Sequence, residues 1–269
     1  MAERAGTPTG EELSYVYVVG PDDPALRRTA HGLQGIEGRS LRWVSDGGLA
    51  ALVSSVPADR FSEAGLAAQL EDLDRLESIA RAHHAVVDAA FSTTTVLPMR
   101  LATVYLNDDR VCALLRQRGS EFATLMDQLA QHVELGVKVY AESSGVPSPE
   151  PAPRAPAGGT GRAYLQQRRA QQRGSQDLHR RAADAAAEAA REAASLASGR
   201  VVHRPQQGEL ASRTGVNVAN EAYLVPAAAV AQFREVIGAV SRDRPGVRID
   251  ITGPWAPYSF ATLTTEREA

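Results

Sequence analysis

The sequence predicts an α+β protein of two domains, for three reasons. Its 269 residues suffice for two ordinary domains, and 43% hydrophobic with 23% charged residues is typical of a soluble globular protein. Short alternating or β-branched runs in the first half are followed by long helical periods. From residue 133 onward the order is strand, helix, strand, strand, helix, strand. We therefore expect an N-terminal domain over 13–131 and a C-terminal domain over 132–269, after a disordered segment over 1–12.

The N-terminal half combines strands with two long helices. Three β-rich runs predict strands at 15–19, 41–44 and 49–56. Asp46-Gly47-Gly48 separates the last two and is a hairpin signal. Leucines recur at three- and four-residue spacing over 64–91, and a similar apolar period runs over 108–131 after two aspartates, which favour a helix N-terminus. This half is predicted to be the smaller α+β unit.

The C-terminal half follows the split βαβ pattern. The sequence predicts strands at 133–140, 201–203, 216–225 and 247–252, with helices at 162–198 and 227–243. This βαββαβ order is that of a modified ferredoxin-like domain, in which both helices cover one face of an antiparallel sheet. Residues 143–161 are rich in Pro and Gly without apolar periodicity, so they are expected to form an inserted linker.

Composition excludes several classes of function. The formal net charge of -3 gives no general case for nucleic-acid binding. The one cysteine, Cys112, cannot form an internal disulfide, and the polar N-terminus lacks the apolar core of a signal peptide. No window approaches 18 apolar residues, so no membrane span is expected. We expect a cytoplasmic protein without a membrane or nucleic-acid partner.

Catalytic and metal-binding patterns are missing from the sequence. No Walker A loop, GxGxxG, HExxH or GxSxG occurs. His83 and His84 are adjacent on a predicted helix, where their side chains point about 100° apart and cannot hold one metal together. We therefore expect no enzyme activity, no catalytic residue, no cofactor and no metal site.

Two groups of residues are candidates for partner binding. Arg162, Arg168, Arg169 and Arg173 follow one another within twelve residues beside Tyr164 at a predicted helix start, where cations oppose the helix dipole. They form either a solvated helix face or an electropositive docking face for an acidic partner or an RNA.

Arg100 is the second candidate. It lies in the segment 97–101 between two predicted helices, where it is either an interface anchor or part of a bridging strand.

An aromatic segment follows the last predicted strand. Its characteristic residues are Gly253, Pro254, Trp255, Pro257, Tyr258 and Phe260. Because proline cannot donate to a sheet ladder, the strand is expected to end or bend at Pro254. The aromatic rings either contact a partner or, as we favour, bury their large surface over one end of the C-terminal sheet.

Six short segments are spread across nearly the whole chain: Tyr15-Val16-Tyr17, 96–100, 134–139, Tyr164-Leu165 with the arginines that follow, 220–225 and 253–260. In their order and spacing, these segments resemble the GvpF/GvpL family of gas vesicle proteins. Ala256 and Gln166-Gln167 depart from the family pattern, and the insertion at 143–161 is long, which leaves the F and L subfamilies open. The resemblance implies a non-enzymatic accessory protein, an adaptor or chaperone that binds the shell protein GvpA and other accessory Gvp proteins while buoyant gas vesicles form. It also implies two α+β domains and association with the vesicle.

Two other functions are compatible with a ferredoxin-like domain. An RNA-binding module needs aromatic rings on the exposed face of its sheet, and the predicted strands offer Tyr140 and Tyr223. A small-molecule regulatory domain needs a pocket with converging polar groups, to which no sequence pattern points.

Overall fold

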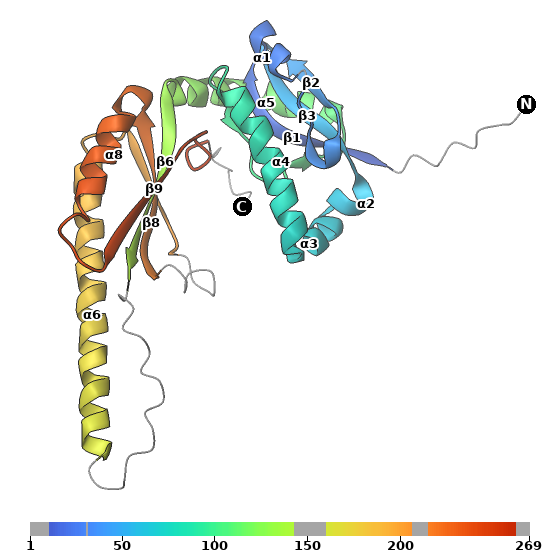
Figure 1. The fold of residues 1–269 in the computed structure, drawn as a ribbon. Coiled ribbons are helices and arrows are strands. Elements are labelled where there is room, and N and C mark those ends of the chain that lie inside the picture. Colours follow the sequence, from blue (N-terminus) through green and yellow to red (C-terminus); the bar gives the residue numbers. More distant parts are fainter. Residues whose placement is uncertain (1–10, 31, 143–159, 206–214, 262–269) are drawn as a thin grey trace, which may run out of the picture. The chain divides into compact units, whose positions relative to one another are not determined.

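The computed structural model describes residues 11–30, 32–142, 160–205 and 215–261, without the side chains of 68–70 and 160–164. By its internal contacts the chain divides into two compact units. Unit 1 comprises Met1–Gln131 and Trp255–Ala269, and unit 2 comprises His132–Pro254. Each unit has an antiparallel sheet with helices packed against it, which confirms the predicted α+β class (Figure 1).

The sheet of unit 1 is built around its first strand. The strands are β1 (Glu12–Pro21), β2 (Leu41–Asp46), β3 (Leu49–Pro57), β4 (Leu97–Pro98) and β5 (Val104–Tyr105). Their order is β2-β3-β1-β4, with β5 also pairing with β1, and the pairs are antiparallel. Gly47 and Gly48 form the predicted hairpin turn at φ values of 61° and 82°, which glycine adopts without steric cost.

The helices of unit 1 are α1 (Pro24–Thr29), α2 (Ala58–Phe61), α3 (Glu63–Glu71), α4 (Leu73–Phe91) and α5 (Asp108–Leu129), with a short 3-10 turn, η1 (Ile36–Gly38). The single helix predicted over 64–91 is interrupted at Asp72, whose backbone is extended. Its carboxylate accepts hydrogen bonds from the N–H groups of Asp74 and Arg75 and so caps α4. Aspartate is a strong N-cap and a weak interior residue, which explains the break.

Helices α4 and α5 pack on opposite faces of this sheet. Side chains alternate between the faces of a strand, so neighbours on β1 point in opposite directions. Ser14 donates to Asp108 at the start of α5, whereas Tyr15 bonds to His83 of α4. Both faces of β1 are consequently covered, and its side chains from Leu13 to Val19 are buried.

Unit 2 has two layers. Its strands are β6 (His132–Ala141), β7 (Gly199–His203), β8 (Val216–Pro226) and β9 (Val247–Trp255), in the order β7-β8-β6-β9. Its helices are α6 (Thr160–Ala193), η2 (Ala227–Ala229) and α8 (Val230–Ala239). One core cluster joins alternate residues of β6 to both α6 and α8, so the two longer helices lie on the same face of the sheet (Figure 1).

Alanine makes the contact between α6 and this sheet. Ala182, Ala185, Ala189 and Ala193 are buried at three- and four-residue spacing, which places them on one face of the helix. Short side chains allow the helix backbone to approach the sheet closely. The packing of α6 on the sheet is therefore close and shallow.

Three expected boundaries are wrong. The disordered segment expected over 1–12 is too long, because Glu12 belongs to β1; residues 1–10 lie outside the described residues. Helix α6 starts at Thr160, within the predicted insertion, whose residues 143–159 are not described. Strand β9 continues through Pro254 to Trp255, because β9 is an edge strand and a proline there breaks no ladder inside the sheet.

Residues from Trp255 onward also depart from the predicted domain limits, which assigned them to the C-terminal domain. They group with unit 1, where Ala256 is fully buried in the core cluster and Tyr258 packs against it. Burial of these side chains in the first core explains the difference.

Candidate functional site

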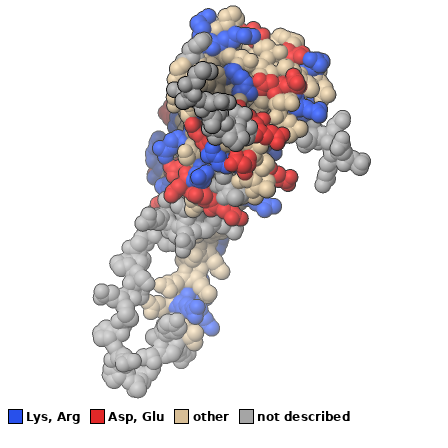
Figure 2. Space-filling view, turned by 90° about the vertical axis from the view of Figure 1, so that its right-hand side faces the viewer, with Lys and Arg blue, Asp and Glu red and all other residues tan. Residues whose placement is uncertain are grey.

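The arginine-rich start of α6 is the first of the two partner-binding candidates that the sequence predicted. Residues 165–177 are exposed on every side of the helix, including Arg168, Arg169 and Arg173. The side chains of Arg162 and Tyr164 lie outside the described residues. This part of α6 extends past the sheet of unit 2 (Figure 1), and Figure 2 shows basic side chains on its protruding end.

Charge along this segment is strongly one-sided. Between residues 165 and 181 the sequence has five arginines and one carboxylate, Asp177. Asp177 accepts a hydrogen bond from Arg180 at 2.8 Å. Among the described residues, Arg168, Arg169 and Arg173 have no acidic partner. An acidic surface would be attracted to this end of the helix.

Arg100 lies at a small cavity in unit 1. The segment that joins β4 to β5 carries this exposed arginine. The cavity has a volume of about 200 Å³, and its walls come from this segment, from α5 and from Tyr258 and Ala261. Of the two alternatives for Arg100, the structure favours a position on a surface rather than within a strand.

A buried polar network fixes the backbone on either side of Arg100. The Tyr15 hydroxyl accepts a hydrogen bond from the Ala102 N–H at 2.9 Å and lies 3.0 Å from His83 Nδ1. Because the Met99 carbonyl beside Nε2 can only accept, His83 carries its proton on Nε2, and the Tyr15 hydroxyl donates to the unprotonated Nδ1. Nε2–H then donates to the Met99 carbonyl at 3.1 Å. The chain of bonds holds Ala102 at a positive φ of 65°.

The imidazole in this network is neutral. His83 is only 3% exposed and stacks on Tyr17 with ring centroids 5.5 Å apart. Burial lowers its pKa from 6.5 to about 4, although the hydrogen bond to Met99 acts in the opposite direction. Both ring nitrogens are used in structural bonds, so His83 orders the Arg100 segment from inside the core.

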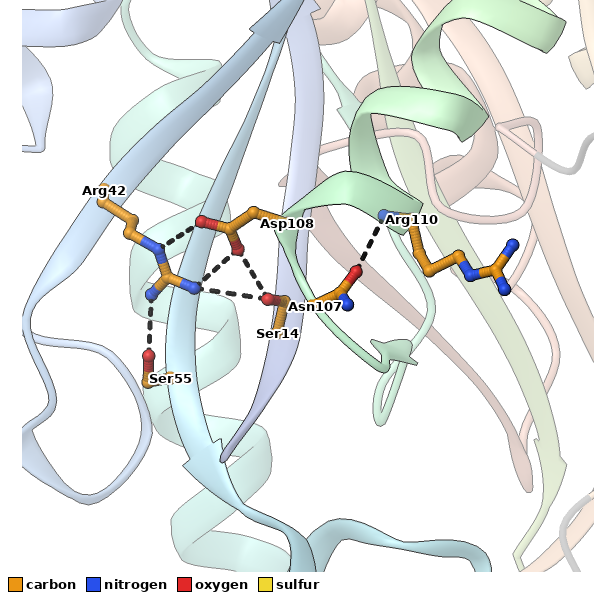
Figure 3. A network of polar contacts seen from close by, with 6 residues as sticks. All are labelled: Ser14, Arg42, Ser55, Asn107, Asp108 and Arg110. Atoms are coloured by element: carbon orange, nitrogen blue, oxygen red, sulfur yellow. Dashed lines mark hydrogen bonds and ion pairs between the residues drawn. The ribbon is translucent and has the colours of Figure 1, made fainter. Parts of the chain in front are cut away.

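A second network, drawn in Figure 3, fixes the start of α5. Helix α5 also forms a wall of the cavity, through Leu114, Arg118 and Phe122. The Arg42 guanidinium donates to both carboxylate oxygens of Asp108, at 2.9 and 2.7 Å, and to Ser55 at 3.0 Å. Ser14 donates to the same carboxylate at 2.6 Å. The Asn107 side chain caps the helix by accepting from the Arg110 N–H. Strands β1, β2 and β3 are thereby tied to the start of α5.

Electrostatics support this arrangement. The hydrogen bond from Arg42 lowers the pKa of the Asp108 carboxyl below its ordinary value, with a smaller contribution from Ser14. Asp108 therefore stays ionised at the helix N-terminus, where a negative charge is favourable.

The aromatic segment at the C-terminus packs on α4, whereas the sequence analysis favoured packing over one end of the C-terminal sheet. The Trp255 ring lies 5.0 Å from that of His84, and Tyr258 lies 6.3 Å from His84. Ala256 and Pro257 are buried, whereas Trp255 remains 39% exposed and Phe260 is half-buried. Before them, the Gly253 carbonyl accepts a hydrogen bond from Arg234 of α8 at 2.5 Å. The prediction failed because Ala256 and Tyr258 pack with the core cluster of unit 1.

The two tyrosines considered for RNA stacking are both covered. Tyr140 is buried beneath the Arg248 guanidinium, 4.2 Å from the ring centroid. Tyr223 faces the helices and contacts Phe233 with ring centroids 5.4 Å apart. Neither ring is available to stack on a base.

Sequence reasoning missed both polar networks. The tyrosines at alternate positions 15 and 17 of an otherwise apolar strand were a signal, because buried hydroxyls need partners. The Arg42–Asp108 pair joins residues 66 positions apart and had no local signal. Within the described ranges, no three His, Cys, Asp or Glu side chains form a possible metal site, and no helix is long and apolar enough to cross a membrane.

Comparisons with known proteins agree along nearly the whole chain. The model of the family "Gas vesicle synthesis protein GvpL/GvpF" matches residues 13–262. The chain is 44% identical to gas vesicle protein L of Streptomyces sp. (strain CB03234), with 95% of both sequences covered. It is 28% identical to gas vesicle protein F of the same organism, over 92% of this chain and 98% of that protein.

Two solved structures have the same fold. One is gas vesicle protein GvpF from Anabaena sp. PCC7120, with a TM-score of 0.67 at 20% identity, covering 94% of this chain and 97% of the other. The other is GvpF from Microcystis aeruginosa, with a TM-score of 0.61 at 17% identity, covering 93% and 99%. With the family match over residues 13–262, these findings establish that the chain belongs to the gas vesicle synthesis protein GvpL/GvpF family.

Proposed function

We propose that the protein is a non-enzymatic accessory protein of gas vesicle formation, which binds the shell protein GvpA and other accessory Gvp proteins during assembly. It acts in the cytoplasm, at the vesicle, as an adaptor or chaperone. Family membership supports a role in gas vesicle synthesis. The 44% identity to a protein L, against 28% to a protein F of the same organism, supports an L-type role.

The observation that carries the binding role is the exposed basic half of α6. A helix that is polar on all sides gains little from folding alone, and residues 165–177 bury no side chain in unit 2. Three arginines without acidic partners in the described chain, Arg168, Arg169 and Arg173, make this surface complementary to a carboxylate-rich one. The proposed occupant is therefore an acidic surface on a gas vesicle protein.

We further propose that the two compact units are separate domains, and that unit 2 is a ferredoxin-like βαββαβ domain. The strand order β7-β8-β6-β9, with α6 and α8 on one face, supports this assignment. The predicted insertion at 143–161 would follow its first strand.

The non-enzymatic role is supported by what the perturbed groups do. His83 has both ring nitrogens in structural bonds inside the core, and Asp108 is held by Arg42 and Ser14. Perturbed pKa values often mark catalytic groups, but here they accompany groups that fix helices to a sheet.

A pull-down tests the proposal. The tagged full-length protein is co-expressed with GvpA and the accessory Gvp proteins, and co-purified proteins are quantified. We expect the double variant Arg168→Ala/Arg169→Ala to fold normally and to retain a partner at least tenfold less. Gln171→Ala/Gln172→Ala, on the same exposed segment, is the matched control and should bind as the wild type does. Wild-type protein that retains no Gvp protein, together with normal vesicles in a deletion strain, would remove the proposal.

The RNA-binding alternative is measured with the same variants. Fluorescent single-stranded RNA is titrated with the wild-type protein at low and high salt. Tight, salt-sensitive binding that Arg168→Ala/Arg169→Ala abolishes would favour RNA as the partner of α6. We expect only weak binding, because Tyr140 and Tyr223 are covered.

A further inference from the structure

The cavity beside Arg100 has the size of a side-chain pocket. Its volume of about 200 Å³ is below the roughly 300–1,000 Å³ of pockets for small molecules. Apolar side chains form much of the wall, among them Leu97, Leu114, Phe122 and Tyr258. The space suits one or two apolar side chains rather than a cofactor.

Charge at the cavity has one sign. Arg100 and Arg118 belong to its lining, and among the described residues no carboxylate does. Arg118 donates two hydrogen bonds, both of 2.7 Å, to Glu121 on the same helix. Within the described chain, the Arg100 guanidinium has no hydrogen bond or ion pair and is exposed. One cation at an apolar pocket is thus available for an incoming carboxylate.

The pocket is preformed on the Arg100 side. The Met99 N–H donates to the Tyr17 carbonyl at 2.9 Å, and the Ala102 N–H donates to the Tyr15 hydroxyl at 2.9 Å. The Arg100 carbonyl itself accepts from the Thr103 hydroxyl at 2.7 Å. A segment already ordered before binding loses little conformational entropy when a partner arrives, which favours affinity.

We propose that this pocket receives an apolar side chain of a gas vesicle protein, on a segment where an Asp or Glu within two residues pairs with Arg100. The inference rests on the proposed function, and it adds a second docking point with its own chemistry. Burial of the apolar group stabilises the complex. The carboxylate orients the partner segment, since a bidentate pair with a guanidinium has a fixed geometry.

Site-specific photo-crosslinking tests this inference in the full-length chain. A benzoylphenylalanine replaces Tyr105 at the pocket or, as the control, Val202 on the exposed edge strand of unit 2. Each protein is co-expressed with GvpA and the accessory Gvp proteins, irradiated, and analysed by mass spectrometry. We expect crosslinks from position 105 to a segment with an apolar residue within two positions of Asp or Glu.

Variants identify the two parts of the interaction. Arg100→Glu reverses the charge at the pocket, and Ala261→Phe fills it; each should lower the crosslink yield at least tenfold. Arg100→Lys should retain part of the yield. Arg110→Glu makes the same charge change on α5 outside the lining and is the matched control (Figure 3). Circular dichroism establishes that every variant is folded.

The outcomes separate this inference from the proposed function. If GvpA or another Gvp protein co-purifies but its crosslinks from position 105 survive both Arg100→Glu and Ala261→Phe, the pocket inference is overturned and the proposed function stands. If no Gvp protein co-purifies with the wild type, both are overturned.

Discussion

Replacing His83 by glutamine should make the stability of unit 1 less dependent on pH. In the folded protein the imidazole is 3% exposed, and burial lowers its pKa from 6.5 to about 4. The unfolded chain therefore binds a proton at His83 in a range of pH where the folded chain does not. Above pH 6.5 His83 is neutral in both states and does not lower the unfolding free energy. As the pH falls from 6.5 towards 4, the unfolding free energy decreases because only the unfolded chain is protonated at His83.

The two pKa values set the size of the effect. The difference between 6.5 and about 4 corresponds to about 3 kcal/mol of unfolding free energy. Between pH 7 and pH 4.5 most of this is lost, about 2 kcal/mol. A glutamine at position 83 has no proton to gain and keeps an amide N–H that can reach towards the Met99 carbonyl. The variant should lose stability at pH 7 and show a pH dependence flatter by about 2 kcal/mol.

Tryptophan fluorescence can follow this unit selectively. Both tryptophans of the sequence, Trp43 and Trp255, belong to unit 1. Urea unfolding is recorded for wild type and His83→Gln between pH 7 and 4.5. His84→Gln removes the neighbouring, partly exposed imidazole from the same helix and is the control. Equal pH dependence in wild type and His83→Gln, or equal flattening in the control, would refute the role assigned to the buried network.

Three further changes test the packing. Arg42→Ala should destabilise unit 1 by about 1 kcal/mol in urea unfolding at pH 7. The loss is modest because Asp108 loses its charged partner but is itself 41% exposed. An unchanged unfolding free energy would show that the network does not stabilise the unit. Trp255→Ala should cost at most about 2 kcal/mol, less than the roughly 3–5 kcal/mol of a fully buried tryptophan, since the ring is 39% exposed beside His84; an unfolded variant would contradict this. Ala185→Leu should lower the unfolding free energy by about 1–3 kcal/mol, because the larger side chain overpacks α6 against its sheet. Thermal melting followed by circular dichroism at 222 nm measures this loss. An unchanged melting temperature would disprove the close approach of α6 to the sheet.

Local patterns predicted the elements well, because each depends on a few neighbouring residues. The alternation in β6 and the glycine pair between β2 and β3 required no knowledge of the rest of the chain. The break at Asp72 was missed although its cause is local, since the apolar period continues through it and masks an N-cap.

Residues at the candidate surfaces were predictable to different degrees. The charge run at the start of α6 is visible in the sequence, whereas the pocket beside Arg100 joins β4, α5 and the C-terminal segment. The same non-local packing explains why the aromatic segment after Pro254 was assigned to the wrong unit. Composition marked Trp255 and Tyr258 as residues that need a packing partner, but it could not say which core would bury them.

The two halves of α6 explain how one helix can both pack against a sheet and display a binding surface. The helix has 34 residues and is about 50 Å long at 1.5 Å per residue. Its C-terminal half is anchored by a stripe of buried alanines, and its N-terminal half, from Leu165 to Asp177, buries nothing in unit 2. An isolated polar helix of that length is marginal in water, so continuity with the anchored half supplies the nucleus on which it forms. The arginines are thus displayed on a helix that is ordered from its anchored end. A partner can bind them without disturbing the packing of α6 against the sheet.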